Sequence, residues 1–96
     1  MIFYSRKQLL ELLEIDDGFV ATLEREEIVF RDGPDAASGE YSDRMLERAR
    51  VARTLMRDLE INLEGTAVIV RLREEIAGLH RERESLLARL SVLERK

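Results

Sequence analysis

The spacing of apolar residues divides this chain into a first part with short helical patterns and a last part with one long, regular pattern. Near the start, Ser5 and Gln8 have the spacing of a capping box, so a helix is expected to follow Ser5. Asp16 is the next N-cap candidate, and the apolar residues after it predict a second helix that ends near Arg25. Two short helices joined by a few residues form the skeleton of a helix-turn-helix.

The segment 28–41 has the sequence signature of a β-hairpin. Ile28-Val29-Phe30 favours a strand, turn-forming residues follow from Asp32 to Gly39, and Tyr41 can supply the returning strand. A hairpin here occupies the place of a wing after a helix-turn-helix. We therefore expect a small β-hairpin wing at about residues 28–41.

Two further helices are predicted after the wing. Ser42 has the position of an N-cap. One apolar face follows it, formed by Met45, Ala49, Ala52, Met56 and Leu59. Asn62 can cap the last helix, and Gly65 falls in the first turn of that helix, where a missing side chain permits close packing. We expect a winged helix-turn-helix domain over residues 1–62 and a dimerisation helix over residues 63–96.

The last helix carries the most regular pattern. Alternating spacings of three and four define four heptads, whose core positions are Ile69, Leu72, Ile76, Leu79, Arg83, Leu86, Leu90 and Leu93. A domain of this size cannot cover such a stripe by itself, so we expect a homodimer formed through a coiled coil. Arg83, the one charged core residue, is expected to weaken the seam and to help fix its register. The pattern leaves parallel and antiparallel pairing open.

Composition narrows the class of protein. With 38% charged and 5% aromatic residues, the chain fits a mainly helical protein better than a β-sandwich. It has no cysteine and one histidine, His80, which excludes thiol catalysis and cysteine-based zinc sites. Because no nucleophile motif or phosphate-binding loop is present, we expect no enzyme activity, cofactor, metal or small-molecule substrate. The first residues do not resemble a signal peptide and no apolar run approaches a membrane span, so a cytoplasmic protein without a membrane partner is expected.

The charges are unevenly distributed. The chain has a formal net charge of -4, and residues 1–43 contain eleven acidic and four basic residues. Five acidic residues lie in or beside the predicted second helix: Asp16, Asp17, Glu24, Glu26 and Glu27. They form either a solvated surface or a docking face for a basic partner. The candidate phosphate contacts are Arg25, Arg50, Arg53 and Arg57, although such arginines more often pack along a helix face or pair with nearby acids.

Four segments carry a family resemblance: Ile2-Phe3-Tyr4-Ser5, Glu40-Tyr41-Ser42-Asp43, Gly65-Thr66-Ala67-Val68-Ile69, and the run Leu72, Ile76, Leu79, Glu82, Leu86, Leu90. Together with the order of elements, they resemble the MerR superfamily of winged helix-turn-helix regulators. Within it, the chain is similar to the CbpM-like chaperone modulators. This resemblance implies a mainly α fold and a non-enzymatic protein that binds the J-domain of a DnaJ-like co-chaperone and inhibits its action with a DnaK-type ATPase.

The alternative implied by the superfamily is a DNA-binding transcriptional regulator. In such members the second helix usually has an arginine and a tyrosine at the positions that match Ala21 and Thr22 here. The glycine that usually follows is matched by Glu27, and Glu40 stands where the wing normally offers an arginine. Because an acidic face repels the phosphate backbone, DNA binding is disfavoured. A third hypothesis is a coiled-coil adaptor that binds another basic protein.

Overall fold

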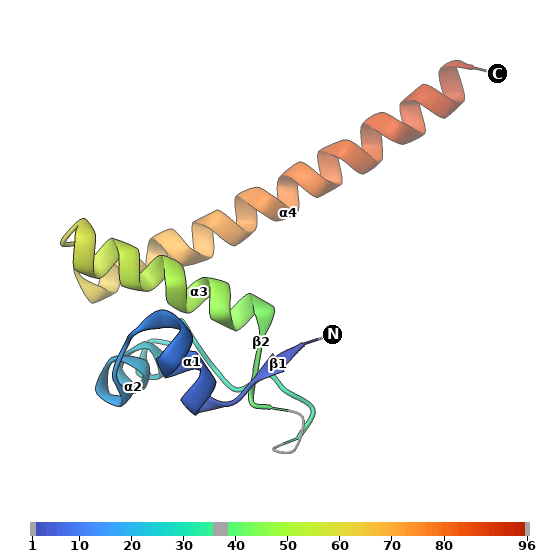
Figure 1. Cartoon of the computed structure of the whole chain (residues 1–96). Coiled ribbons are helices and arrows are strands. Elements are labelled where there is room, and N and C mark those ends of the chain that lie inside the picture. Colours follow the sequence, from blue (N-terminus) through green and yellow to red (C-terminus); the bar gives the residue numbers. More distant parts are fainter. Residues whose placement is uncertain (1, 36–38, 96) are drawn as a thin grey trace.

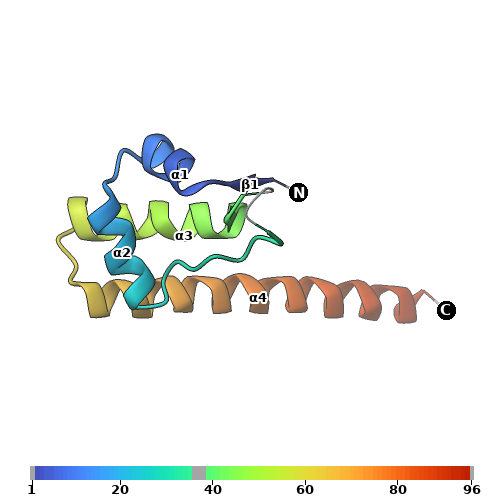
Figure 2. The ribbon, with the colours of Figure 1, turned by 90° about the horizontal axis from the view of Figure 1, so that it is seen from below.

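A central helix, α3, organises the fold. The computed structural model describes residues 2–35 and 39–95. The elements are β1 (Phe3–Tyr4), α1 (Arg6–Leu13), α2 (Asp17–Arg25), β2 (Tyr41–Ser42), α3 (Asp43–Arg53), η1 (Thr54–Asp58) and α4 (Leu63–Glu94). The π-helical turn η1 extends α3, and α3 lies between α1 on one side and the start of α4 on the other (Figures 1 and 2).

The α-helices begin where the capping residues predict. Ser5 Oγ accepts a hydrogen bond from the Gln8 amide at 3.1 Å, and Gln8 Oε1 accepts one from the Ser5 amide at 2.9 Å, which completes the capping box. Asp16, Ser42 and Asn62 accept bonds from amides three residues further on, at the starts of α2, α3 and α4. Each cap satisfies an amide that has no partner inside the helix. The predicted helices are thus confirmed.

The core is formed by apolar side chains from every helix except η1. Its buried members are Leu9, Leu13, Ile15, Val20, Leu23, Ile28, Val29, Tyr41, Met45, Ala49, Ala52, Ala67 and Val70. The predicted inner face of α3 is confirmed for its first three residues, and Met56 packs against the core from η1. The prediction that Leu59 belongs to this inner face is wrong, because Leu59 is 61% exposed. The wider winding of η1 changes the angular spacing of side chains, so the helical pattern does not continue to Leu59.

The small antiparallel sheet is present, but one predicted strand is wrong. Tyr41–Ser42 pairs with Phe3–Tyr4, and Ile28-Val29-Phe30 forms no strand. Ile28 and Val29 are both buried, whereas successive residues of a two-stranded ribbon face opposite sides. Their amides bond to the Leu23 carbonyl and end α2 instead.

The loop between α2 and β2 is nevertheless tied to the sheet. The amides of Asp32 and Gly33 donate to the Glu40 carbonyl, and the Glu40 amide donates to the Tyr4 carbonyl. The carboxylate of Asp32 accepts bonds from the amide and the hydroxyl of Ser42. The predicted tip of the wing falls partly on residues 36–38, which lie outside the described residues.

The long C-terminal helix is confirmed as α4. Its first turns pack on the domain through Thr66, Ala67 and Val70, which are buried. A Cβ atom added at Gly65 would lie 3.0 Å from Cγ2 of Ile61, so the close packing expected there is confirmed. From Leu79 to Arg95 every residue is exposed, and the helix projects away from the domain (Figure 1). Among the described residues, no helix combines the length and apolar character needed to cross a membrane.

Candidate interaction surfaces

The acidic residues of α2 are partly engaged within the chain. Asp16 caps α2, and its Oδ1 accepts a bond from the Phe19 amide at 2.8 Å. Asp17 and Glu24 lie on the same face, two turns apart, and both bind the guanidinium of Arg6, at 2.5 Å and 2.6 Å. The bond to Asp17, followed by the one to Glu24, raises the pKa of Arg6 above its ordinary value. Arg6 therefore remains charged and fixes the start of α1 against α2.

The sequence did not identify this role of Arg6. The guanidinium also donates to the hydroxyl of Tyr41 at 3.2 Å, and that hydroxyl lies 3.3 Å from Oε2 of Glu24. Arg6 and Glu24 are eighteen residues apart in the chain, and no local spacing links them. The only available signal was the presence of two basic residues, Arg6 and Lys7, at the start of a helix that precedes an acidic segment.

Glu26 and Glu27 lie beyond the other end of α2. Both are exposed, and neither forms an ion pair within the described part of the chain. Glu27 has a φ of 57°, the left-handed conformation that glycine adopts most readily. The five acidic residues thus divide into three that support the fold and two that face solvent at the C-terminal end of α2. We call Glu26 and Glu27 the acidic tip.

The candidate phosphate-binding arginines have partners inside the chain. Arg53 Nη1 donates to the Leu13 carbonyl at 2.6 Å, and Arg57 Nη2 donates to the Glu14 carbonyl at 3.3 Å. Both bonds satisfy carbonyls at the C-terminal end of α1, where a cation is favourable. Of the other two candidates, Arg50 binds Glu47 at 2.8 Å and Arg25 lies 3.4 Å from Thr22 Oγ1.

A second arginine cluster joins α3 to α4. Arg44 binds Glu74 through two nitrogens, at 2.9 Å and 3.0 Å, and this pairing lowers the pKa of Glu74. Arg48 is 7% exposed, and its Nε lies 3.8 Å from the same carboxylate. Desolvation lowers the pKa of Arg48. The guanidinium carbons of Arg44 and Arg48 lie 5.9 Å and 5.8 Å from the centre of the Phe30 ring, within the range of a cation–π contact.

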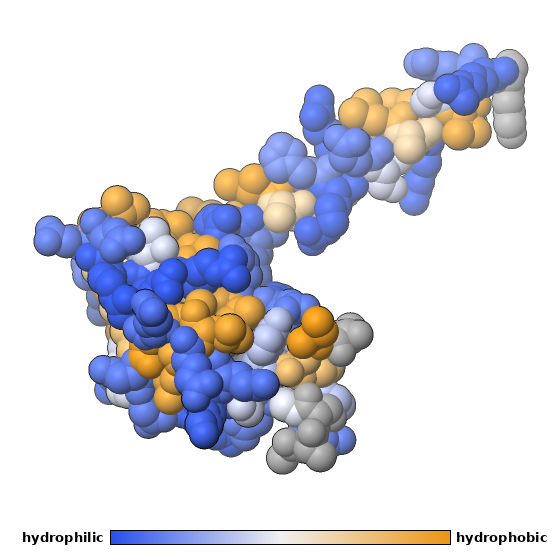
Figure 3. Space-filling view, in the orientation of Figure 1, coloured by the Kyte–Doolittle hydropathy of each residue, from blue (hydrophilic) through white to orange (hydrophobic). Residues whose placement is uncertain are grey.

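The predicted dimerisation stripe lies along the outer side of α4. Ile69 is half-buried, and six leucine or isoleucine residues are between 49% and 64% exposed: Leu72, Ile76, Leu79, Leu86, Leu90 and Leu93. Arg83 is exposed within the same stripe. In Figure 3, orange apolar patches lie along the projecting helix, with blue polar surface between them. The domain packs on a different side of α4, through Thr66, Ala67 and Val70, and so leaves this stripe open.

No metal site is indicated by the described residues, because no three His, Asp or Glu side chains gather as possible ligands. His80 is exposed and lies beside Ile76, Leu79 and Arg83 on the helix surface.

The fold and these surfaces define a class: a winged helix-turn-helix domain with a long C-terminal helix. The chain belongs to the MerR HTH family of regulatory proteins, whose family model matches residues 4–88. No curated protein and no solved structure matches the chain.

Proposed function

We propose that this chain is a non-enzymatic chaperone modulator that binds the J-domain of a DnaJ-like co-chaperone and inhibits its action with a DnaK-type ATPase. The observation that carries the proposal is the acidic character of α2 and its end, in particular the exposed acidic tip. A J-domain presents basic residues where it engages its ATPase partner, so complementary charge supports docking there.

The arginines that already have partners within the chain favour a protein partner over DNA. Arg53 and Arg57 bond to the end of α1, and Arg50 pairs with Glu47. Phosphates would therefore compete with these partners for the guanidinium groups. On α2, Ala21 is exposed and offers no polar group, while the Thr22 hydroxyl donates to the Gly18 carbonyl at 3.0 Å. A DNA-binding module obtains most of its affinity from phosphate contacts, and this face supplies few.

The second candidate function is DNA-binding regulation. The family description names helix-turn-helix regulators, and that description supports this candidate. In this case the wing and α2 would contact the DNA duplex. Replacing the acidic residues of α2 by basic ones would then strengthen DNA binding.

The proposed functional unit is a homodimer formed through α4. The exposed stripe continues for four heptads, and water-exposed leucines at this spacing are typical of a coiled-coil seam. The two acidic tips of such a dimer would offer two equivalent docking surfaces.

Charge reversal at the acidic tip tests the proposal. The variant Glu26→Lys/Glu27→Lys changes exposed residues without ion pairs in the described chain, so the fold is expected to persist. We expect its affinity for the J-domain to fall at least about tenfold, because each reversed charge repels a basic surface. The control Glu11→Lys/Glu84→Lys makes the same change in net charge at exposed sites elsewhere. Equal loss in both variants would indicate a non-specific charge effect, and a gain in duplex DNA binding by the tip variant alone would favour the second candidate.

A further inference from the structure

We propose that the corner between α3 and α4 binds a small phosphate-bearing anion, which Arg44 and Arg81 contact and the buried charge of Arg48 attracts. These side chains surround the carboxylate of Glu74, and we call the space between them the arginine groove. None of these residues belongs to α2, so the proposal is independent of the acidic tip and of the J-domain.

The arginine groove lies where α4 leaves the domain. Arg44, near the start of α3, lines one side, and Glu74, Ala77 and Arg81 of α4 line the other, around a volume of about 490 Å³. Figure 3 shows the surface hollowed at the place where the projecting helix departs from the domain. A hollow of this volume accommodates a small molecule rather than a single ion only.

The side chain of Arg81 folds back along α4 into the groove. Its Nη2 lies 3.7 Å from the point where a Cβ atom would stand on Gly78, which is half-buried and has no side chain to narrow the groove. Within residues 2–35 and 39–95, Arg81 forms no ion pair. Its guanidinium therefore lines the groove with an uncompensated charge.

Arg48 is a buried cation whose charge is only partly compensated. It is 7% exposed, and its Nε has no hydrogen-bond acceptor among the residues that the structure describes. One oxygen of Glu74, Oε1, lies 3.8 Å from this Nε and already accepts a bond from Arg44 at 2.9 Å. Because Arg48 is buried, solvent ions screen its charge weakly. A positive potential therefore reaches the groove from behind Glu74.

Positive charge exceeds negative charge in this corner. Four guanidinium groups lie around the single carboxylate of Glu74, those of Arg44, Arg48, Arg71 and Arg81. Burial lowers the pKa of Arg48, and the nearby charges of Arg44 and Arg71 lower it further. Since these like charges repel one another, a second anion beside Glu74 is favoured.

A phosphate group matches this excess of positive charge. A phosphate monoester carries about −1.5 to −2 charges at pH 7, and arginine binds its oxygens through adjacent N–H groups. Arg44 uses Nε and Nη2 for Glu74, so Nη1 is the nitrogen that can donate to the ligand. The centre of the Phe30 ring, 5.9 Å from the guanidinium carbon of Arg44, attracts this group without occupying an N–H.

The arginine groove lies on the side of α4 opposite the dimerisation stripe. Glu74 follows Leu72 by two positions, and Arg81 follows Leu79 by two, which turns each of them about 200° away from the stripe. A helix seated on the stripe therefore leaves the groove open to a ligand.

An NMR titration of arginine side chains in the full-length chain tests the site. Inorganic phosphate and glycerol phosphate are added separately at constant ionic strength, and the Nε–H signals of Arg44 and Arg81 are followed. We expect both signals to shift and to saturate in the millimolar range or below. The probe that binds more tightly shows whether free phosphate or a phosphate ester is the preferred ligand. Shifts that remain linear up to about 20 mM would overturn the proposal, because they indicate no defined site.

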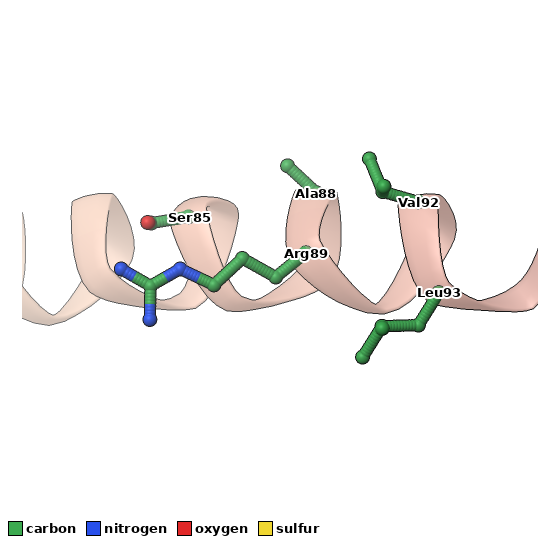
Figure 4. Close-up of a pocket in the computed structure, with 5 residues that line it drawn as sticks. All are labelled: Ser85, Ala88, Arg89, Val92 and Leu93. Atoms are coloured by element: carbon green, nitrogen blue, oxygen red, sulfur yellow. The ribbon is translucent and has the colours of Figure 1, made fainter.

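The variant Arg81→Gln removes one contact of the ligand. Arg81 is exposed, so the fold is expected to persist, and the affinity for glycerol phosphate should fall at least about fivefold. Arg89→Gln is the matched control, because it makes the same change in charge at an exposed position of α4, where the guanidinium extends along the helix toward Ser85 (Figure 4). This control should bind as the natural chain does. Equal affinities of the two variants would overturn the proposal, because net charge alone would then explain the effect.

Discussion

Three glutamates in this chain adopt a backbone conformation that normally favours glycine. Glu14, Glu27 and Glu60 have φ values of 54°, 57° and 55°, and each follows the end of a helical element. An L-residue with a side chain is strained in this region, and a carboxylate near a helix C-terminus also opposes the helix dipole. These residues therefore reduce stability, and the tip of α2 retains Glu27 despite that cost.

Replacing Glu27 by glycine is expected to stabilise the fold. Glycine adopts the left-handed conformation without strain, and the variant Glu27→Gly should raise the free energy of unfolding by about 0.5–1 kcal/mol. Urea denaturation followed by circular dichroism measures the change. The neighbouring variant Glu26→Gly is the control, because Glu26 has a φ of -92° and gains nothing from glycine. Equal effects in the two variants would show that lost charge, rather than backbone strain, is responsible.

The ion pair of Glu74 predicts a defined dependence of stability on pH. Arg44 lowers the folded-state pKa of Glu74 below its ordinary value of 4.5. A carboxylate with a depressed pKa stabilises the folded state above its unfolded-state pKa, and this contribution is lost as the pH falls through the folded value.

The variant Glu74→Gln removes that contribution. At pH 7 it should be less stable than the natural chain, and the difference should shrink steadily below pH 4.5. Thermal unfolding at a series of pH values measures both curves. A difference in stability between the two chains that stays constant down to pH 3 would mean that the ion pair between α3 and α4 does not contribute to the stability of the fold.

At the scale of elements, the bond between Arg53 and the end of α1 joins two helices that are distant in sequence. The Leu13 carbonyl has no partner within α1, and a charged donor satisfies it at 2.6 Å. The variant Arg53→Met keeps most of the aliphatic stem and removes this donor. We expect a loss of about 1.5–3 kcal/mol in the free energy of unfolding, as is typical of bonds to charged groups.

Arg50→Met is the matched control on the same helix. Arg50 is exposed and pairs with Glu47 three residues away, so this variant should change stability by less than about 0.5 kcal/mol. Chemical denaturation compares both variants with the natural chain. Similar stability losses in the two would contradict the capping role assigned to Arg53.

The proposed coiled-coil seam of α4 also predicts the effect of Arg83, its one charged core residue. The variant Arg83→Leu removes a charged side chain from a core position, and self-association should tighten about tenfold or more. Sedimentation at several concentrations measures the dissociation constant. Arg81→Leu, on the outer side of the helix in the same turn, is the control and should change association little. Unchanged association of the Arg83 variant would exclude this residue from the interface, and weaker association would contradict the expectation that its charge weakens the seam.

Local signals in the sequence predicted the starts of the helices well, but they did not predict the contacts between separate elements. Ser5, Asp16, Ser42 and Asn62 act as caps within three residues of their partners, so spacing alone identified each helix start. Pairing between β1 and β2 joins residues nearly forty positions apart, and the β-prone segment Ile28-Val29-Phe30 misled the prediction. Burial of Ile28 and Val29 in the core outweighed their preference for a strand.

The candidate surfaces also differ in whether a local pattern or a contact between distant residues defines them. The heptad stripe was evident from spacing, because its members share one helix. The roles of Arg6, Arg48 and Glu74 depend on contacts between separate elements, and no local pattern indicates them. As a result, the acidic residues of α2 looked equivalent in the sequence, although Asp17 and Glu24 bind Arg6 and the acidic tip faces solvent.

At the scale of the whole molecule, the two ends of the chain have different properties. The N-terminal domain carries most of the negative charge, and α4 carries an apolar stripe that extends well beyond the domain. The molecule measures 57 × 35 × 19 Å, and the long dimension follows from the projecting helix (Figure 1). This division fits a regulator that assembles through α4 and contacts its target through the domain.

The proposed interaction with a J-domain is most directly tested by calorimetric titration of the full-length chain with the J-domain of a DnaJ-like protein from the same organism, at low and at physiological salt. The account predicts a dissociation constant in the micromolar range or lower that rises with salt, because opposite charges on the two surfaces are screened. Absence of binding at low salt, with both proteins folded, would contradict the proposed function.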